Sequence, residues 1–292
     1  MATLAYKLPF NMPPAEVAAV RARVEALAAA AQYGWGHTID FGPFTQPGLL
    51  AEEYLGIADL LDERGWWPKS LAGMTVADVG CYTGGLLLYM AARRPAHIYG
   101  VDELPTHLDQ ARFLVDLYKI PNVTFIEDSV YRLADKIPPQ SIDIILLSGV
   151  LYHLSDMLLG LYLMRRLLKQ GGTLIIESNG VNDMRQSYAN FGRFKSGMWW
   201  QPSGLSIVDM CQFMGFEDID LFFYKKNRCL ARATRASLDE IPFKRGINWA
   251  FEDLTDASRR QFGLEGMAPV APRRPPRHLA AQARMYARKK RG

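Results

Sequence analysis

Polar residues and glycines stand where four short apolar runs of the sequence end. The run TVADVG carries Asp78 and Gly80, HIYGVD ends in Asp102, NVTFIED ends in Asp128, and DIILLS ends in Ser148. A glycine after a strand lets the backbone approach a ligand closely and leaves the N–H groups of the next helix free to donate. A carboxylate offers two acceptor oxygens. We therefore expect a nucleoside-containing ligand, with Asp102 on its ribose hydroxyls and Asp128 on the exocyclic amine of adenine.

The glycine-rich turn GCYTGG departs from the fingerprint of dinucleotide-binding proteins. After Gly80 the next position of that fingerprint is Tyr82, and the next glycine is Gly84. This departure counts against a nicotinamide-dependent oxidoreductase, whereas a non-catalytic nucleotide-binding module stays open as an alternative. For Asp102, a cap of the helix that Pro105 begins is the alternative role.

A second group of residues could act on an acceptor molecule. His37, Tyr152 and His153 are candidates for a base that removes a proton. A loop containing Trp199 and Trp200 could wall the acceptor pocket, because large rigid rings cover a planar ligand at low entropy cost. The alternative for the histidines is a structural hydrogen bond, and for the tryptophans it is core packing.

Metal binding, disulfide formation and membrane insertion are not expected. Several oxygen-bearing side chains follow the fifth apolar run, but such residues at a strand end are usually turn formers; they are Glu177, Asn179, Asn182 and Asp183. The three cysteines are odd in number and lack C-x-x-C spacing, which favours a reducing, cytoplasmic location. No apolar run approaches the roughly 20 residues that span a bilayer.

The elements that must position these residues alternate between short apolar runs and amphipathic stretches. This alternation predicts an α/β fold, a Rossmann-like, doubly wound and mostly parallel sheet. Seven strands are expected, at residues 75–80, 98–102, 122–126, 142–147, 173–178, 218–224 and 228–234. The last two form an antiparallel hairpin at the C-terminal side, because only three residues join them. Helices are expected over 13–32, 49–64 and 203–214, the first two forming an N-terminal lid.

The charge of the chain is unevenly distributed. The 292 residues contain 34 basic and 30 acidic side chains, but residues 273–292 hold eight of the basic ones and no acidic one. The remainder, with 26 basic against 30 acidic residues, has a net charge of −4. A mildly acidic body favours a small-molecule partner, whereas the basic tail leaves RNA open as an alternative partner.

The series ADVGCYTGG, YGVDEL, IEDSV, IDIILLSGVLYHL and GGTLIIES resembles the class I S-adenosylmethionine-dependent methyltransferases, over about residues 74–234. HTIDFGPFTQPG, GVLYHL and WWQPSGL resemble the branch that contains the tRNA wobble-uridine carboxymethyltransferases. The resemblance implies S-adenosylmethionine as cofactor. It implies a cofactor-binding set of Asp78, Gly80, Tyr82, Gly84, Asp102, Asp128, Ser129, Val130 and Ser148, with Ser148 under the sulfonium and Tyr152 beside the transferred group.

The resemblance also bears on which group is transferred. The branch uses a carboxylated cofactor, whose extra carboxylate requires a lysine and an arginine nearby. The loop GWGHTIDFGPF contains no lysine, so we expect plain methyl transfer to a heteroatom of a small molecule, with tRNA modification as the alternative. The expected segments are a helical lid with an aromatic loop (1–70), the methyltransferase domain (71–236), an extension (237–267) and a proline-rich, basic, flexible tail (268–292).

Overall fold

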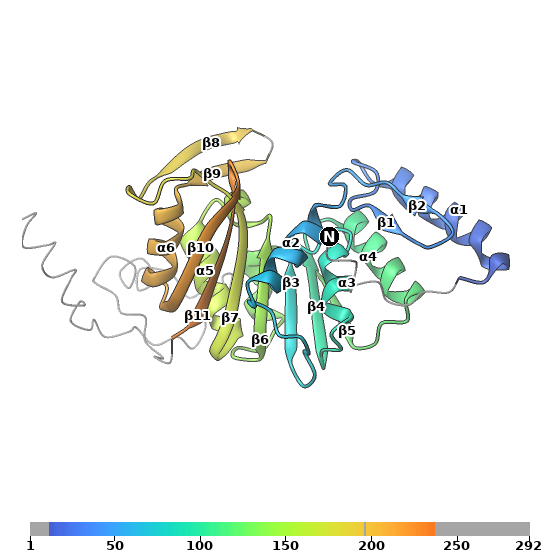
Figure 1. Cartoon of the computed structure of the whole chain (residues 1–292), viewed down its shortest axis with the longest axis horizontal. Coiled ribbons are helices and arrows are strands. Elements are labelled where there is room, and N and C mark those ends of the chain that lie inside the picture. Colours follow the sequence, from blue (N-terminus) through green and yellow to red (C-terminus); the bar gives the residue numbers. More distant parts are fainter. Residues whose placement is uncertain (1–11, 196, 237–292) are drawn as a thin grey trace, which may run out of the picture.

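The fold is built on a seven-stranded sheet with the strand order β10-β11-β7-β6-β3-β4-β5 (Figure 1). The computed structural model describes residues 12–195 and 197–236. The strands of this sheet are β3 (Thr75–Val79), β4 (His97–Asp102), β5 (Val123–Glu127), β6 (Ile142–Ser148), β7 (Leu168–Asn179), β10 (Phe216–Lys225) and β11 (Arg228–Arg235). The five strands from β3 to β7 are parallel, whereas β11 pairs antiparallel with β7 and β10 with β11. The predicted Rossmann-like fold with its antiparallel C-terminal hairpin is confirmed.

Helices cover both faces of the sheet, and each face has its own apolar core. Among the described residues the α-helices are α1 (Pro14–Ala30), α2 (Glu53–Glu63), α3 (Gly85–Ala91), α4 (Pro105–Leu117), α5 (Met157–Leu167) and α6 (Gly204–Phe213). Residues of α5 and α6 fill one core, and residues of α1 to α4 fill the other. Ser203 caps α6 by accepting from the Ser206 amide, which satisfies a donor at the helix start. This layering leaves the carboxyl ends of the parallel strands open for a ligand.

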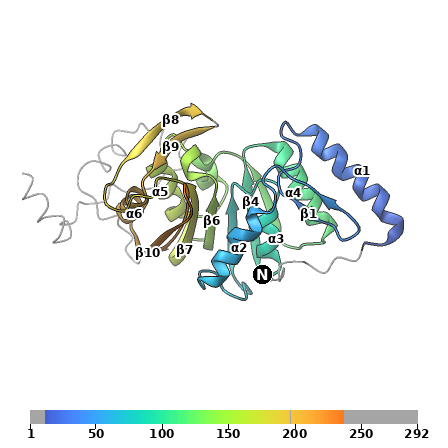
Figure 2. The same ribbon diagram turned by 45° about the horizontal axis from the view of Figure 1, so that its top comes forward.

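The N-terminal segment packs on the helical layer beside β3 and β4. Figures 1 and 2 show α1 beside α4, and the buried Gln110 of α4 donates to the carbonyl oxygens of Leu27 and Gly34. The loop after α1 contains a short ribbon of two strands, β1 (Ile39–Asp40) and β2 (Thr45–Gln46). Its aromatic residues Trp35 and Phe41 are almost fully buried. The segment is therefore part of the folded core.

The tryptophan pair lies in a strand, not in the predicted loop. Trp199 and Trp200 belong to β9 (Met198–Pro202), which pairs antiparallel with β8 (Ala189–Lys195) to form a separate hairpin. Aromatic residues favour strands, and Gly197 supplies the positive φ of +74° that the turn requires. Both views show this hairpin at one end of the main sheet.

The extension 237–267 and the basic tail 268–292 lie outside the described residues. Within 12–195 and 197–236, no helix is both long and apolar enough to cross a membrane.

Candidate active site

The turn after β3 is shaped for close approach to a ligand. Gly80 has φ +79°, and a Cβ there would lie 2.2 Å from Cγ2 of Val150. Tyr82 also has a positive φ, +51°, in a region that side chains with a Cβ rarely adopt. Its amide donates to Oδ2 of Asp102 at 3.0 Å, which holds the turn in this conformation. The turn therefore exposes its backbone at the carboxyl end of β3.

Asp78 is a buried carboxylate without a partner. Its residue is 1% exposed, and neither of its oxygens has a hydrogen-bond donor among the described residues. Burial and the nearby charge of Asp102 raise the pKa of Asp78 to about 7. An unpaired buried carboxylate is destabilising unless a donor or cation reaches it. A ligand with an ammonium group could supply the donor that Asp78 lacks.

Asp102 ends β4 and is held by three donors. Oδ2 accepts from the Tyr82 amide, and Oδ1 accepts from the Leu104 amide and from Nδ1 of His107, both at 3.0 Å. A carboxylate has about four acceptor positions, so the remaining position lies on Oδ2. The ring of Tyr82 packs edge-on against His107, with centroids 4.2 Å apart. Asp102 is thus oriented in advance for a hydroxyl donor.

Asp128 lies just beyond β5 and carries a negative charge. Burial raises its pKa, but Lys136, the Ser129 amide and Arg132 outweigh burial and hold the pKa below its ordinary value. Lys136 Nζ lies 2.9 Å from Oδ2 of Asp128. The side chain of the following Val130 is buried. An ionised carboxylate beside an apolar side chain suits an amino-substituted aromatic base.

Tyr152 lies in the turn after β6 and is held by a charged cluster. Nη1 of Arg228, at the start of β11, donates to the Tyr152 hydroxyl at 3.1 Å. The same guanidinium forms a two-point ion pair with the fully buried Glu177 at the end of β7. Glu177 also accepts from the Tyr224 hydroxyl at 2.7 Å and from the Gly149 amide at 3.1 Å. The hydroxyl of Tyr152 is therefore fixed at the sheet edge.

Glu177 is thus committed to hydrogen bonds with the protein. Of the other oxygen-bearing residues near it, Asn179 accepts from Gln201 and Asp183 accepts from the Arg185 amide. Within the described parts of the chain, no group of three or more histidine, cysteine or acidic side chains could hold a metal ion.

His37 connects the N-terminal segment to the glycine-rich turn. It is 7% exposed, and its Nδ1 accepts from the Gly85 amide at 3.2 Å and contacts the Thr83 hydroxyl at 3.1 Å. The amide of His37 donates to the same hydroxyl at 3.0 Å. Burial and the neighbouring His107 lower the pKa of His37 to about 4. The imidazole is therefore neutral, with its Nδ1 lone pair directed at the start of α3.

His153 lies against the tip of the β8–β9 hairpin. Its Nδ1 is 2.8 Å from the carbonyl oxygen of Gly197. A carbonyl oxygen only accepts, so Nδ1 carries the proton and Nε2 is the basic atom of the neutral ring. The rings of Tyr152 and His153 are adjacent, with centroids 4.2 Å apart. In the hairpin, Nε1 of Trp200 donates to the Ser155 carbonyl oxygen at 2.9 Å, next to this segment.

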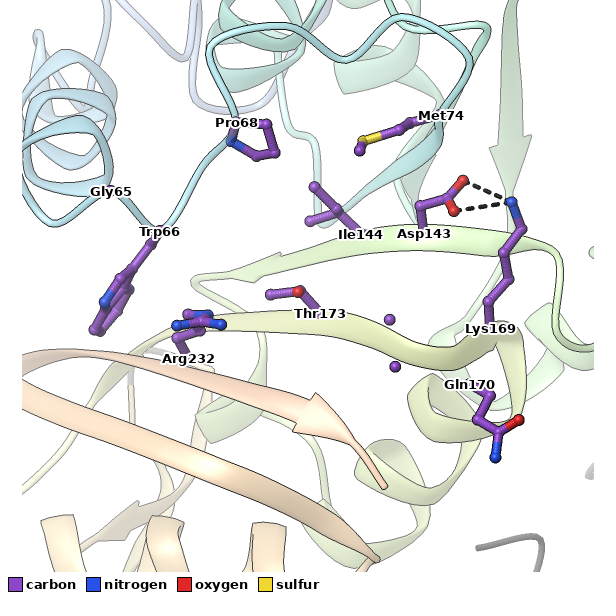
Figure 3. Close-up of a pocket in the computed structure, with 12 residues that line it drawn as sticks. Gly65, Trp66, Pro68, Met74, Asp143, Ile144, Lys169, Gln170, Thr173 and Arg232 are labelled. Carbon is purple, nitrogen blue, oxygen red and sulfur yellow. Dashed lines mark hydrogen bonds and ion pairs between the residues drawn. The ribbon is translucent and has the colours of Figure 1, made fainter. Parts of the chain in front are cut away.

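A cavity of about 370 Å³ lies at the opposite, amino-terminal end of β3 and β6 (Figure 3). Lys169 and Asp143 form an ion pair on one side of it, and Trp66 and Arg232 lie on the other side. The residues that line it include none of the predicted site residues. The cavity is therefore separate from the ligand site at the carboxyl ends of the strands.

Comparison with known proteins agrees with this geometry. A methyltransferase-domain family matches residues 70–203. The tRNA U34 carboxymethyltransferase of Desulfotalea psychrophila is 30% identical over 234 residues, which cover 77% of this chain and 68% of that protein. The chain belongs to the class I S-adenosylmethionine-dependent methyltransferases. S-adenosylmethionine is their cofactor, and it supplies an activated methyl group on a sulfonium.

Other relatives and structures place this methyltransferase in a broad family. A second tRNA U34 carboxymethyltransferase, from Trichodesmium erythraeum, is 27% identical over 162 residues, about half of each chain (53% and 48%). The ubiquinone biosynthesis O-methyltransferase of Acinetobacter baylyi is 29% identical over 182 residues, which cover 62% of this chain and 69% of that protein. Among solved structures, EvdMO1 superposes with a TM-score of 0.54 at 17% identity, covering 75% of this chain and 48% of the other. EvdMO1 therefore shares the fold of this chain.

The residues at the carboxyl ends of the strands fit the cofactor. The orphaned Asp78 offers a partner for the ammonium of the methionine part, Asp102 an acceptor for the ribose, and Asp128 an acceptor for the adenine amine. Ser148 ends β6 at the same edge. Reasoning from the sequence missed His107, Thr83 and Arg228. The only signal for Arg228 in the sequence is a basic residue at the start of the last predicted strand, 228–234.

Proposed function

We propose that this methyltransferase transfers the methyl group of S-adenosylmethionine to a uridine of tRNA. The supporting observation is the 30% identity to a tRNA U34 carboxymethyltransferase over 234 residues, a match much longer than the methyltransferase domain at residues 70–203. This relationship supports the tRNA alternative more strongly than the small-molecule acceptor that the acidic body favoured. The hairpin of β8 and β9 beside Tyr152 and His153 gives an acceptor surface outside the cofactor site.

The charges around Tyr152 support methyl transfer over carboxymethyl transfer. Arg228 is the only cation bonded to Tyr152 in the described structure, and Glu177 offsets its charge. The lid loop, residues 33–48, contains neither lysine nor arginine, and its Phe41 is fully buried. A further carboxylate on the cofactor would be desolvated there without a net positive charge, which is costly. The site therefore favours the uncharged methyl group.

The protein's part in such a transfer is alignment and proton removal. A sulfonium methyl is already activated, so the enzyme must hold the acceptor lone pair in line with the bond that breaks and exclude water. We assign Tyr152 to orient the acceptor and Nε2 of His153 to take its proton where the acceptor is protonated. We assign His37 to hold the glycine-rich turn, because its Nδ1 accepts from Gly85.

The test offers the purified chain two pools of acceptors with S-adenosylmethionine labelled in its methyl group: bulk tRNA and a small-molecule extract. The proposal predicts label in tRNA, and a loss of that label when Tyr152→Phe is used at equal S-adenosylhomocysteine binding. Label confined to the small-molecule pool would contradict it.

A small-molecule acceptor is the second candidate. The 29% identity to a ubiquinone biosynthesis O-methyltransferase, over 69% of that protein, favours it, as does the net charge of −4 outside the basic tail. Under this candidate His153 would deprotonate a hydroxyl. The same experiment separates the two, because only one of the two pools becomes labelled.

A further inference from the structure

The hairpin of β8 and β9 presents the aromatic ring of Phe191 to solvent, close to the segment that carries Tyr152 and His153. Phe191 of β8 is 56% exposed, an unusual degree for a phenylalanine. It pairs across the strands with Trp200, and the ring centroids are 5.3 Å apart. The ring of Trp199 lies 6.3 Å from Phe191, at an angle of 31° between the planes. Phe191 and Trp199 together form a surface that we name the aromatic ledge.

The ledge is fixed in place by its inner side. Trp200 packs against the core formed by α5 and α6, and its indole N–H is bonded to the carbonyl oxygen of Ser155. At the turn, the Gly197 carbonyl oxygen accepts from His153. These two anchors tie the hairpin to the segment that carries Tyr152. A molecule stacked on the ledge would therefore lie next to the transfer site.

We propose that the aromatic ledge stacks an unpaired nucleobase of single-stranded RNA, next to the base that is methylated. This inference rests on the proposed function and names the part of the substrate that the hairpin binds. Every nucleobase has a flat face, and stacking on exposed aromatic rings binds single strands without sequence preference. The hairpin sequence 189–202 contains Arg193 and Lys195 and no acidic residue, which complements a phosphate backbone.

The exposure of the ledge argues for a nucleobase over an enclosed small molecule. Small ligands are usually bound in pockets that bury most of their surface. Phe191 has more than half of its surface in solvent and lies on a two-stranded ribbon. An open aromatic surface with basic sequence around it is typical of proteins that bind single strands.

The experiment measures binding of a fluorescent, short, single-stranded oligoribonucleotide by anisotropy, across a salt series. Phe191→Leu and Trp199→Leu are compared with the wild type and with Phe213→Leu. Phe213 is a matched control, because it is 39% exposed and lies on α6, outside the hairpin. We expect each ledge variant to bind about tenfold more weakly, from the loss of a stacking partner. The slope of affinity against salt should not change, since no phosphate contact is removed.

Each outcome bears on one of the two proposals. If the wild type and the ledge variants bind the oligoribonucleotide equally well and the variants still bind S-adenosylhomocysteine, the proposed role of the ledge is wrong. This holds even where tRNA is methylated. An equal loss in Phe213→Leu would overturn that role as well. Ledge-dependent RNA binding without methylation of any tRNA would keep the ledge and contradict the proposed function. A duplex of the same sequence should bind the wild type and the variants equally, because its bases are already stacked.

Discussion

Replacing Asp78 by asparagine should stabilise the cofactor-free protein and abolish cofactor binding. Burial and Asp102 raise the pKa of Asp78 from an ordinary 3.8 to about 7. A tenfold change in an ionisation equilibrium corresponds to about 1.4 kcal/mol, so this difference corresponds to about 4 kcal/mol. The unfolded chain ionises Asp78 at a lower pH than the folded chain does. The folded wild type therefore loses stability as the pH rises from about 4 to 7, and the variant does not.

The assay is urea unfolding of wild type and Asp78→Asn at several pH values. The difference in the free energy of unfolding should be near zero below pH 4 and should grow to about 4 kcal/mol in favour of the variant above pH 7. Comparing the two proteins at each pH removes the effects of other titrating groups. A difference that is constant with pH, or that favours the wild type, would refute the view of Asp78 as an unpaired buried acid.

Cofactor binding supplies the second half of this prediction. The cofactor's ammonium should stabilise the ionised form of Asp78, so binding below pH 7 should release a proton. Calorimetry in two buffers of different ionisation enthalpy should detect this proton near pH 6 and not above pH 8. The asparagine variant should release none, and its affinity should fall beyond detection. Normal affinity in the folded variant would show that Asp78 is not the ammonium partner.

Three further substitutions test the surrounding contacts. Gly80→Ala should lower the free energy of unfolding by about 1–3 kcal/mol and weaken cofactor binding, because the new Cβ would lie 2.2 Å from Val150. Adding Val150→Ala should restore only part of the lost stability, since φ at position 80 stays at +79°. His37→Ala should weaken cofactor binding about tenfold, because it removes the hydrogen bond from Gly85 in the glycine-rich turn. A fall in kcat at unchanged cofactor affinity would instead identify His37 as a catalytic base. Arg228→Met should destabilise the protein by about 3–5 kcal/mol in thermal or urea unfolding, because the buried Glu177 would lose its counter-ion. The double variant with Glu177→Gln should recover most of the loss. If the single variant is fully stable, the pair is not buried in solution.

The sheet could be predicted from the sequence because each strand is a short apolar run bounded by turn residues. Tyr82 stands where the dinucleotide fingerprint has its second glycine, so this departure from the glycine pattern is visible in the sequence itself. The hairpin of Trp199 and Trp200 was not predicted. It forms outside the main sheet and is held by contacts between distant residues: Trp200 packs on the core and donates to Ser155, and His153 donates to Gly197.

The contacts within the site were harder to predict because they join residues far apart in sequence. His107 reaches Asp102 only because α4 begins at Pro105 and turns the histidine back toward β4. Arg228 meets Tyr152 across 76 positions, once β11 pairs with β7. His37 could be chosen as a chemically competent residue from the sequence, but its burial against Gly85 depends on the packing of the whole N-terminal segment. The roles of these residues in catalysis stay predictions.

Mass spectrometry of tRNA nucleosides tests methyl transfer to tRNA most directly. The full-length protein is incubated with unmodified tRNA and S-adenosylmethionine that carries a trideuterated methyl group. We expect a uridine-derived nucleoside whose mass has increased by that methyl group, and we expect it to be absent from reactions with Asp78→Asn. Two results would contradict methyl transfer to tRNA. One is tRNA that stays unlabelled while the cofactor is turned over. The other is a nucleoside that has gained the mass of a carboxymethyl group when carboxylated cofactor is added in competition.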